Sequence, residues 1–295
     1  MITCTWRQAL DADEAWEVRE LVAEAAEYDE EAGFSTVTPP GETRGHELLV
    51  RIQPGEGERV WPLAAYLRVD VDEGVGAVQF VVRPRFRSLG VATSVFEKIG
   101  LPGSSAGNWC GTSARELRIW AHGDHPAAHR MARRFGARPV SRMWALVRRL
   151  DAAAEWPSGP LTVRAATAAE AARVAGIEAG ATGLVSPAGW EHLLPGSVAL
   201  VAVGESGEPR GVVRLSGPAA NGSPGTATGV VLTLAVAGSG DRGVVRALLG
   251  AGLDHLRRGG AGKVELYLDS GNRTGVAVAR EFSFEHDRSD VCYLV

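Results

Sequence analysis

The segment from Arg83 to Ala92 carries residue types that can hold an anion without a metal. It reads Arg-Pro-Arg-Phe-Arg-Ser-Leu-Gly-Val-Ala and follows an apolar run that the proline ends. Gly90 and Ala92 let backbone N–H groups converge on an anion. The start of the next helix adds a partial positive charge, and Arg87 can add a full one. The pattern has neither a Walker lysine nor a Rossmann glycine triplet, and it predicts a phosphate-binding turn.

The elements that position this turn follow from the apolar periodicity. In the first half, a helix precedes three strands, and a second helix follows the turn. A strand, a short helix and a last strand complete the set. The helices are expected near 12–27, 90–100 and 125–137, and the strands near 46–53, 63–71, 76–82, 117–122 and 141–149.

The second half repeats this order. A constant offset of 147 residues pairs Ala132 with Ala279 and Phe135 with Phe282. Strands are expected near 197–203, 209–215, 229–236 and 264–270, with helices near 244–258 and 272–284. Two prolines and a glycine between the halves predict a linker. We therefore expect a domain over 1–150, a linker over 151–160 and a second domain over 161–295, in an α/β fold with a mixed sheet.

A strand, then Arg/Gln-x-x-Gly-x-Gly/Ala, then a helix resembles the acyl-CoA pyrophosphate loop of the GNAT acetyltransferase superfamily. Arg87, Gly90 and Ala92 fall on its three defined positions. Two such domains in one chain, with the segments Trp6–Glu14 and Trp120–Gly123, are similar to mycothiol synthase and its relatives. The resemblance implies two tandem GNAT-like acyl-CoA N-acyltransferase domains.

The resemblance also implies which residues touch acetyl-CoA, the expected co-substrate. Two neighbouring strands would splay, and the pantetheine arm would pass between them. The residues that would bind pantetheine through their backbone are Phe80, Val81 and Val82, and those that would hold the pyrophosphate are Arg87, Ser88, Leu89, Gly90, Val91 and Ala92.

The second domain departs from the family pattern. Its loop, Gly240–Val245, keeps the central glycine but has glycine at the first position. Val245 replaces Gly or Ala, and Asp241 adds a negative charge. The family's catalytic Glu is matched by about Val230, and its acid Tyr by Ala279. We expect weak or no acetyl-CoA binding by this half, and the activity of mycothiol synthase itself is disfavoured.

The first domain keeps the loop but lacks the catalytic acid and base residues that are usual in the family. Gln79 stands where relatives often have Glu, and it can orient a water but cannot take a proton. Ala132 takes the place of the acid Tyr. His122, at the end of a strand, is the best candidate base, although an ordinary histidine at a strand end is favoured over that role. His125 and His129 lack a third ligand, so no metal site is predicted.

Composition limits the remaining functions. A net charge of −4 argues against a nucleic-acid partner, and no apolar run is long enough to span a membrane. Three widely spaced cysteines, Cys4, Cys110 and Cys292, suit a reduced cytoplasm. The acidic run Glu24–Glu31 could cover the site of a cationic amine, but a solvated surface is slightly favoured.

We therefore expect an acetyl-CoA-dependent N-acetyltransferase, in which a small-molecule amine attacks the thioester directly. The alternative is an acyl-CoA-binding protein without turnover, acting as a sensor or partner subunit. The missing Glu and Tyr in both domains favour the alternative, and the intact loop of the first domain favours the enzyme. The acceptor amine, the acyl chain length and the oligomeric state are left open.

Overall fold

The computed structural model describes residues 1–31, 45–54, 61–99, 111–150, 156, 161–180, 196–217, 227–238 and 240–295. The chain divides into two compact units. Unit 1 comprises Met1–Val140 together with Asp290–Val295, and unit 2 comprises Ser141–Ser289. Each unit contains strands and helices, and none of the described helices has the length and apolarity needed to cross a membrane.

The sheet of unit 1 has the strand order β1-β2-β3-β4-β5-β12. All neighbouring strands are antiparallel except β4 and β5. A parallel pair needs a crossover connection, and the turn predicted to bind phosphate lies in that crossover. The strands are β1 (Ile2–Arg7), β2 (His46–Ile52), β3 (Leu63–Asp72), β4 (Val75–Val82), β5 (Glu116–Ala121) and β12 (Glu285–Leu294), the last of which enters unit 1 at Asp290.

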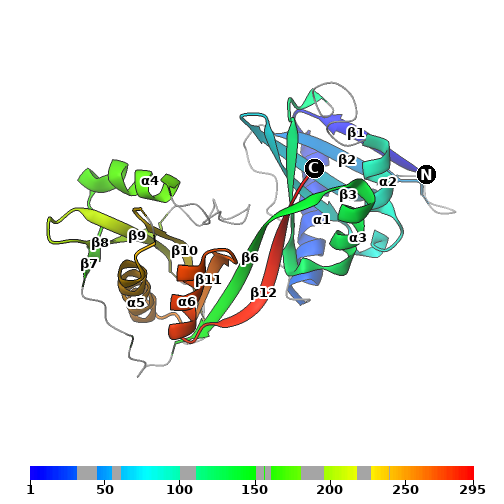
Figure 1. The fold of residues 1–295 in the computed structure, drawn as a ribbon. Coiled ribbons are helices and arrows are strands. Elements are labelled where there is room, and N and C mark those ends of the chain that lie inside the picture. Colours follow the sequence, from blue (N-terminus) through cyan, green and yellow to red (C-terminus); the bar gives the residue numbers. More distant parts are fainter. Residues whose placement is uncertain are drawn as a thin grey trace. The chain divides into compact units, whose positions relative to one another are not determined.

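Helices cover both faces of this sheet (Figure 1). On one face, α1 (Ala12–Glu31) buries Val18 and Leu21 against β2 and β3. On the other face, α2 (Val91–Ile99) buries Val95 and Phe96, and α3 (Pro126–Phe135) packs beside it. Alternating strand residues point to opposite faces, so β4 sends Val81 toward α1 and Val78 and Phe80 toward α2.

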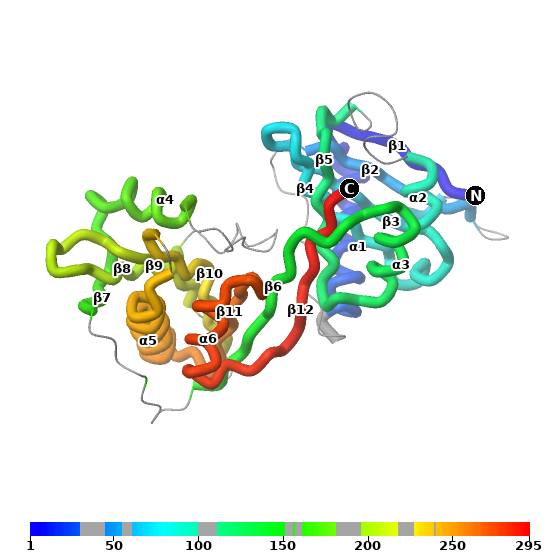
Figure 2. The backbone as a smooth tube through the Cα atoms, in the orientation of Figure 1, coloured from blue at the N-terminus to red at the C-terminus, as the bar shows by residue number. Residues whose placement is uncertain are grey.

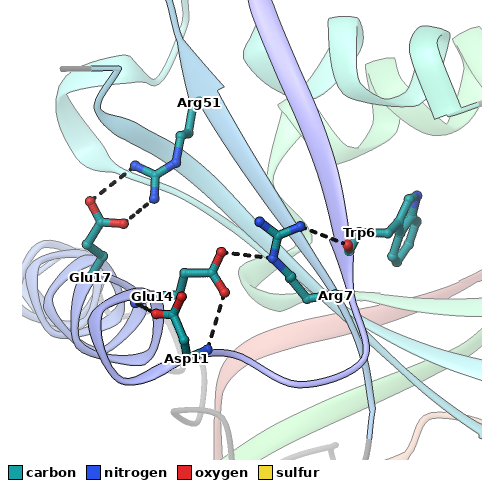
Figure 3. A network of polar contacts seen from close by, with 6 residues as sticks. All are labelled: Trp6, Arg7, Asp11, Glu14, Glu17 and Arg51. Carbon is teal, nitrogen blue, oxygen red and sulfur yellow. Dashed lines mark hydrogen bonds and ion pairs between the residues drawn. The ribbon is translucent and has the colours of Figure 1, made fainter. Parts of the chain in front are cut away.

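A polar network fixes the first turn of α1 (Figure 3). Asp11 accepts the Glu14 N–H at 2.8 Å, and Glu14 accepts the Asp11 N–H at 3.3 Å, which is a reciprocal capping box. Glu14 also pairs with Arg7 of β1 at 2.8 Å, and Glu17 pairs with Arg51 of β2. Asp11 is therefore the N-cap of α1, and the two ion pairs tie the start of this helix to two strands.

Unit 2 repeats the arrangement, with the strand order β7-β8-β9-β10-β11-β6 and one parallel pair, β10 with β11. Its strands are β7 (Thr162–Ala165), β8 (Val198–Val203), β9 (Pro209–Ser216), β10 (Thr228–Val236), β11 (Lys263–Asp269) and β6 (Arg138–Arg149), the last of which enters unit 2 at Ser141. Its helices are α4 (Ala171–Gly180), α5 (Arg242–Arg258) and α6 (Arg273–Glu281). The largest buried cluster of the described residues lies between α5, α6 and this sheet.

The last strand of the first half of the sequence, β6, completes the sheet of unit 2. The last strand of the second half, β12, completes the sheet of unit 1. β6 pairs with β11, from Met143 opposite Asp269 to Arg149 opposite Lys263. β12 pairs with β5, and Figure 2 shows the C-terminal end of the chain beside that strand. The two compact units therefore contain different residue ranges from the domains 1–150 and 161–295 that the repeat predicts.

Most strands and helices begin and end within about two residues of the expected positions. The helix predicted at 12–27 extends to Glu31, and the strand predicted at 141–149 begins at Arg138. The predicted linker lies outside the described residues except for Trp156. Its indole stacks on Phe282 and donates to Asp254 at 2.8 Å.

Candidate active site

The turn between β4 and α2 has the backbone that an anion site needs. A short 3-10 turn, η1 (Pro84–Phe86), follows β4, and Gly90 then adopts a left-handed φ of +77°. The first hydrogen bond of α2 joins Ser94 N–H to Gly90 O at 2.9 Å. The amides of Val91, Ala92 and Thr93 therefore precede the helical ladder. In the described part of the chain, no side chain accepts a hydrogen bond from these three amides.

The position that a Cβ would take on Gly90 is open space. A Cβ added to Gly90 would meet no atom within 4 Å, so the glycine is required by its φ and not by close packing. An open helix N-terminus with N–H groups and a partial positive charge fits the pyrophosphate of an acyl-CoA. The predicted contacts of Ser88, Leu89, Gly90, Val91 and Ala92 with that group stay a prediction.

The Arg87 side chain is engaged by the protein itself. Its guanidinium donates to both oxygens of Asp29 in α1, at 2.5 and 3.1 Å, and its Nε donates to Val82 O at 2.9 Å. Its guanidinium carbon also lies 5.1 Å from the centre of the Tyr28 ring. These contacts tie the turn to α1 and to the end of β4. A direct contact between Arg87 and phosphate stays a prediction.

The acidic run at the end of α1 supplies partners for this turn. In addition to the Asp29–Arg87 pair, Glu24 Oε2 lies 3.4 Å from Arg83 Nε. Two carboxylates of the run thus neutralise arginines on either side of η1. Within the described residues, Glu24 and Asp29 therefore anchor the turn to α1. This role differs from both expectations for the acidic run, which were a solvated surface and a cover over an amine site.

An apolar cavity opens where β4 and β5 separate. Their parallel pairing ends with Val78 opposite Ile119, whereas β4 continues to Val82 against β3. The cavity has a volume of about 190 Å³ and lies on the face covered by α2 and α3. It is lined by Phe80, Ala92, Phe96, Ile119, Trp120, Ala121, Ala128, Met131, Ala132, Phe135, Ala137, Tyr293 and Val295. Its position and apolar walls suit a thin, flexible chain such as pantetheine.

His122 lies at the carboxyl end of β5, in the short turn η3 (His122–Asp124). Its Nδ1 is 3.3 Å from Oδ2 of Asp290, a fully buried carboxylate on β12. The other oxygen of Asp290 accepts the Gly123 N–H at 2.9 Å. Asp290 therefore fixes the turn after β5 and places a carboxylate beside the His122 ring. Asp290 was not predicted from the sequence, because it lies 168 positions after His122. The run of polar residues before the apolar end of β12 was the available signal.

Gln79 lies on the opposite face of the sheet from the cavity. It stands beside Arg68 on β3, on the face that packs against α1. Arg68 Nη1 is 3.5 Å from buried Glu47, and the Tyr66 hydroxyl donates to the same carboxylate. Burial and this hydrogen bond raise the pKa of Tyr66 above its ordinary range. Sequence reasoning missed this cluster, although a glutamate in the apolar run of β2 is an available signal. No hydrogen bond joins Gln79 to His122 among the described residues.

The two helix histidines do not converge on a metal. His125 is the N-cap of α3, and its Nδ1 accepts the Ala127 N–H at 3.1 Å. His129 contacts Tyr293 and Asp124 instead. The described residues contain no cluster of three metal-ligating side chains.

In unit 2 a protein carboxylate caps the helix that corresponds to α2 in the sequence repeat. Asp241 is the N-cap of α5, and its Oδ1 accepts the N–H groups of Gly243 at 2.8 Å and Val244 at 3.4 Å. Its Oδ2 pairs with Arg210 at 3.1 Å. Val245 is buried in the core. The start of α5 therefore already has an anion, which is consistent with the expected weakness of acetyl-CoA binding by this half.

Comparisons with known proteins place the chain in a family. A scan against family models gives no match. The mycothiol acetyltransferase of Saccharomonospora viridis is 30% identical, over 98% of this chain and 97% of that protein. The chain belongs to the mycothiol acetyltransferase family. The Nocardia farcinica member is 28% identical, over 99% of this chain and 97% of its own length. The predicted resemblance is confirmed, and the chain is an acyltransferase.

Solved structures show the same fold. A tandem GNAT protein from the clavulanic acid biosynthesis pathway superposes with a TM-score of 0.65 at 17% identity, covering 100% of this chain and 98% of its own. A GCN5-related N-acetyltransferase from Sphaerobacter thermophilus gives a TM-score of 0.58 at 22% identity, covering 99% and 95%. The predicted α/β class, with two tandem GNAT-like folds, is confirmed in this member of the mycothiol acetyltransferase family.

Proposed function

We propose that the chain transfers the acetyl group of acetyl-CoA to a small-molecule amine, with the acetyl-CoA bound by unit 1. The observation that carries this proposal is the contrast between two helix N-termini. The start of α2 has no side-chain cap among the described residues and has open space at Gly90, whereas Asp241 caps the start of α5. An anionic pyrophosphate is favoured at the first and repelled at the second.

The cavity of unit 1 supports the same assignment. The amides at the start of α2 would hold the pyrophosphate, and the apolar walls between β4 and β5 would exclude water from the pantetheine arm. Beyond Val78, β4 no longer pairs with β5, so the backbone of Phe80, Val81 and Val82 borders the separation. Their N–H groups are the proposed donors to pantetheine and to the thioester oxygen.

The amine would attack the thioester carbonyl carbon directly, since this transfer needs a neutral nucleophile held at the carbonyl. His122 is the proposed proton acceptor for the amine. The buried Asp290 carboxylate lies 3.3 Å from its Nδ1 and would stabilise the imidazolium that forms when it takes a proton. Gln79, on the α1 face, is proposed to orient a water or the acceptor without taking a proton.

The acceptor belongs to the amine class. The relatives are named for mycothiol, so the deacetylated form of mycothiol is the first amine to test. The acetyl group is proposed as the transferred acyl group for the same reason. No metal has a role in this proposal.

The test combines binding with turnover. Calorimetry of the full chain with acetyl-CoA should give a heat of binding, and a thiol assay should show CoA release with at least one amine of a broad panel. His122→Ala should slow release by about 10²-fold if the imidazole takes the amine proton. No heat with acetyl-CoA would overturn the proposal. Heat without release across the panel would instead assign unit 1 a binding role.

A further inference from the structure

Tyr293 brings a phenol to the cavity of unit 1 from the end of the chain. It lies on β12 opposite Ile119 of β5, is 6% exposed, and lines the cavity. Tyr293 packs against Ala132, which stands where the GNAT pattern has its acid tyrosine. Among the described residues that line this cavity, Tyr293 alone has an ionisable side chain.

The Tyr293 hydroxyl is the inner end of a chain of polar groups. Its oxygen lies 3.0 Å from Nδ1 of His129 on α3, and Nε2 of His129 lies 2.7 Å from Oδ1 of Asp124 in η3. The rings of Tyr293 and His129 meet edge to face. The side chains of His129 and Asp124 are 45% and 24% exposed. The chain therefore connects a buried phenol in the cavity wall to solvent.

We propose that Tyr293 is the catalytic acid of unit 1, and that His129 and Asp124 are positioning residues that reconnect it to solvent. The inference rests on the proposed function. The amine nitrogen forms a bond to the thioester carbon, the carbon–sulfur bond breaks, and the sulfur takes the electron pair and the phenol proton. The amine proton leaves through the base or water. The phenolate then regains a proton from solvent through His129.

The surroundings of the hydroxyl support this role. Small side chains, Ala121, Ala128 and Ala132, line the cavity next to Tyr293 and leave room for a sulfur atom. Both ring nitrogens of His129 are engaged, so the imidazole is held in one orientation beside the phenol oxygen. An acid held in this way acts without reorganisation when the thiolate leaves. His122 does not line the cavity. Its proposed role concerns the other proton of the reaction, the one that leaves the amine.

A binding experiment tests the contact without turnover. CoA should bind the full chain about five-fold more tightly than desulfo-CoA, which has hydrogen in place of the thiol, because one hydrogen bond is lost. In Tyr293→Phe the two should bind equally. Tyr267→Phe is the matched control. Tyr267 is a buried tyrosine of unit 2 whose hydroxyl is also hydrogen-bonded, and its loss should leave the five-fold ratio unchanged.

Turnover supplies the second readout. Tyr293→Phe should lower kcat for CoA release by about 10²-fold with an unchanged KM for acetyl-CoA. His129→Gln should lower kcat less, and the double variant should be no slower than Tyr293→Phe. An unchanged kcat in Tyr293→Phe, or equal binding of CoA and desulfo-CoA by the wild type, would overturn the assignment of Tyr293. The proposed function itself fails if the wild type does not bind acetyl-CoA, or if it binds acetyl-CoA and releases no CoA with any amine of the panel.

Discussion

The Arg87 guanidinium donates to both carboxylate oxygens of Asp29, 58 residues earlier in the chain, at 2.5 and 3.1 Å. Both partners are largely shielded from solvent. The pair joins the end of α1 to the turn that precedes α2. Arg87 therefore anchors the backbone of the proposed phosphate-binding turn, and its charge is already matched by a carboxylate.

Asp29→Asn is expected to weaken acetyl-CoA binding about five-fold, because the turn loses a charged anchor. Arg87→Gln should weaken binding by a similar factor, and the double variant should be no weaker than either single variant. Calorimetry on the four proteins measures the coupling. Tighter binding by Asp29→Asn would contradict this account, since it would mean that Asp29 withholds the Arg87 charge from the phosphate.

Gly90→Val should abolish acetyl-CoA binding, because a β-branched residue is strained at a φ of +77° and its side chain would enter the anion site. Gly207→Val is the matched control. Gly207, in a turn of unit 2, also has a φ of +77°, and a Cβ there also meets no atom within 4 Å. Both variants should lose similar thermal stability, and only the first should lose binding. Equal affinities in the two variants would refute the position of the cradle.

Acetyl-CoA should bind with a stoichiometry of one per chain, since Asp241 already satisfies the start of α5. Asp241→Ala should lower the free energy of unfolding of unit 2 by about 1 kcal/mol through loss of the cap. Asp241→Ser keeps an oxygen at the cap and should lose less. Urea unfolding and calorimetric titration give the two quantities. Two acetyl-CoA sites of similar affinity on the wild type would contradict the assignment.

Acid should remove a stabilising contribution from the start of α4. Hydrogen bonds from Arg164, and from the Thr167 backbone and hydroxyl, lower the pKa of Glu170 from 4.5 to about 2. A lowered folded-state pKa stabilises the fold above the unfolded value and loses that effect as the pH falls toward the folded value. The wild type should therefore unfold at higher urea than Glu170→Gln at pH 7, and the difference should close between pH 4.5 and about 2. The emission of Trp156, stacked on Phe282 in unit 2, is one reporter. A gap that is constant with pH would refute the charge effect.

The local sequence was sufficient to predict the turn between β4 and α2 and the strands and helices around it. The residues from Arg83 to Ala92 determine their own backbone through proline, glycine and the start of a helix, and the structure has a helix start there. The cap at Asp11 was also readable, because both of its partners lie within one turn. Such features depend on neighbours in the chain, and a pattern of residue types records them.

The pairing partners of the strands could not be predicted from the sequence in the same way. β6 and β12 look like ordinary last strands of their halves, and alternation of apolar residues does not say which edge a strand joins. Asp290 and Tyr293 were missed for this reason. The roles of Asp29 and Asp241 were also hidden, because a carboxylate near a phosphate loop can either repel the ligand or hold the loop, and only the contacts distinguish the two.

The exchange of last strands has a consequence for biosynthesis. Asp290–Val295 complete the sheet of unit 1, so β5 has no partner on that side until unit 2 and these residues have been synthesised. Most of unit 1 is translated before unit 2, but its last strand follows unit 2 in the sequence, so its β5 edge is unpaired during synthesis of unit 2. Asp290 and Tyr293 lie in this segment, so a chain that stops before Asp290 would keep the proposed phosphate-binding turn and lose both the carboxylate beside His122 and the proposed catalytic acid.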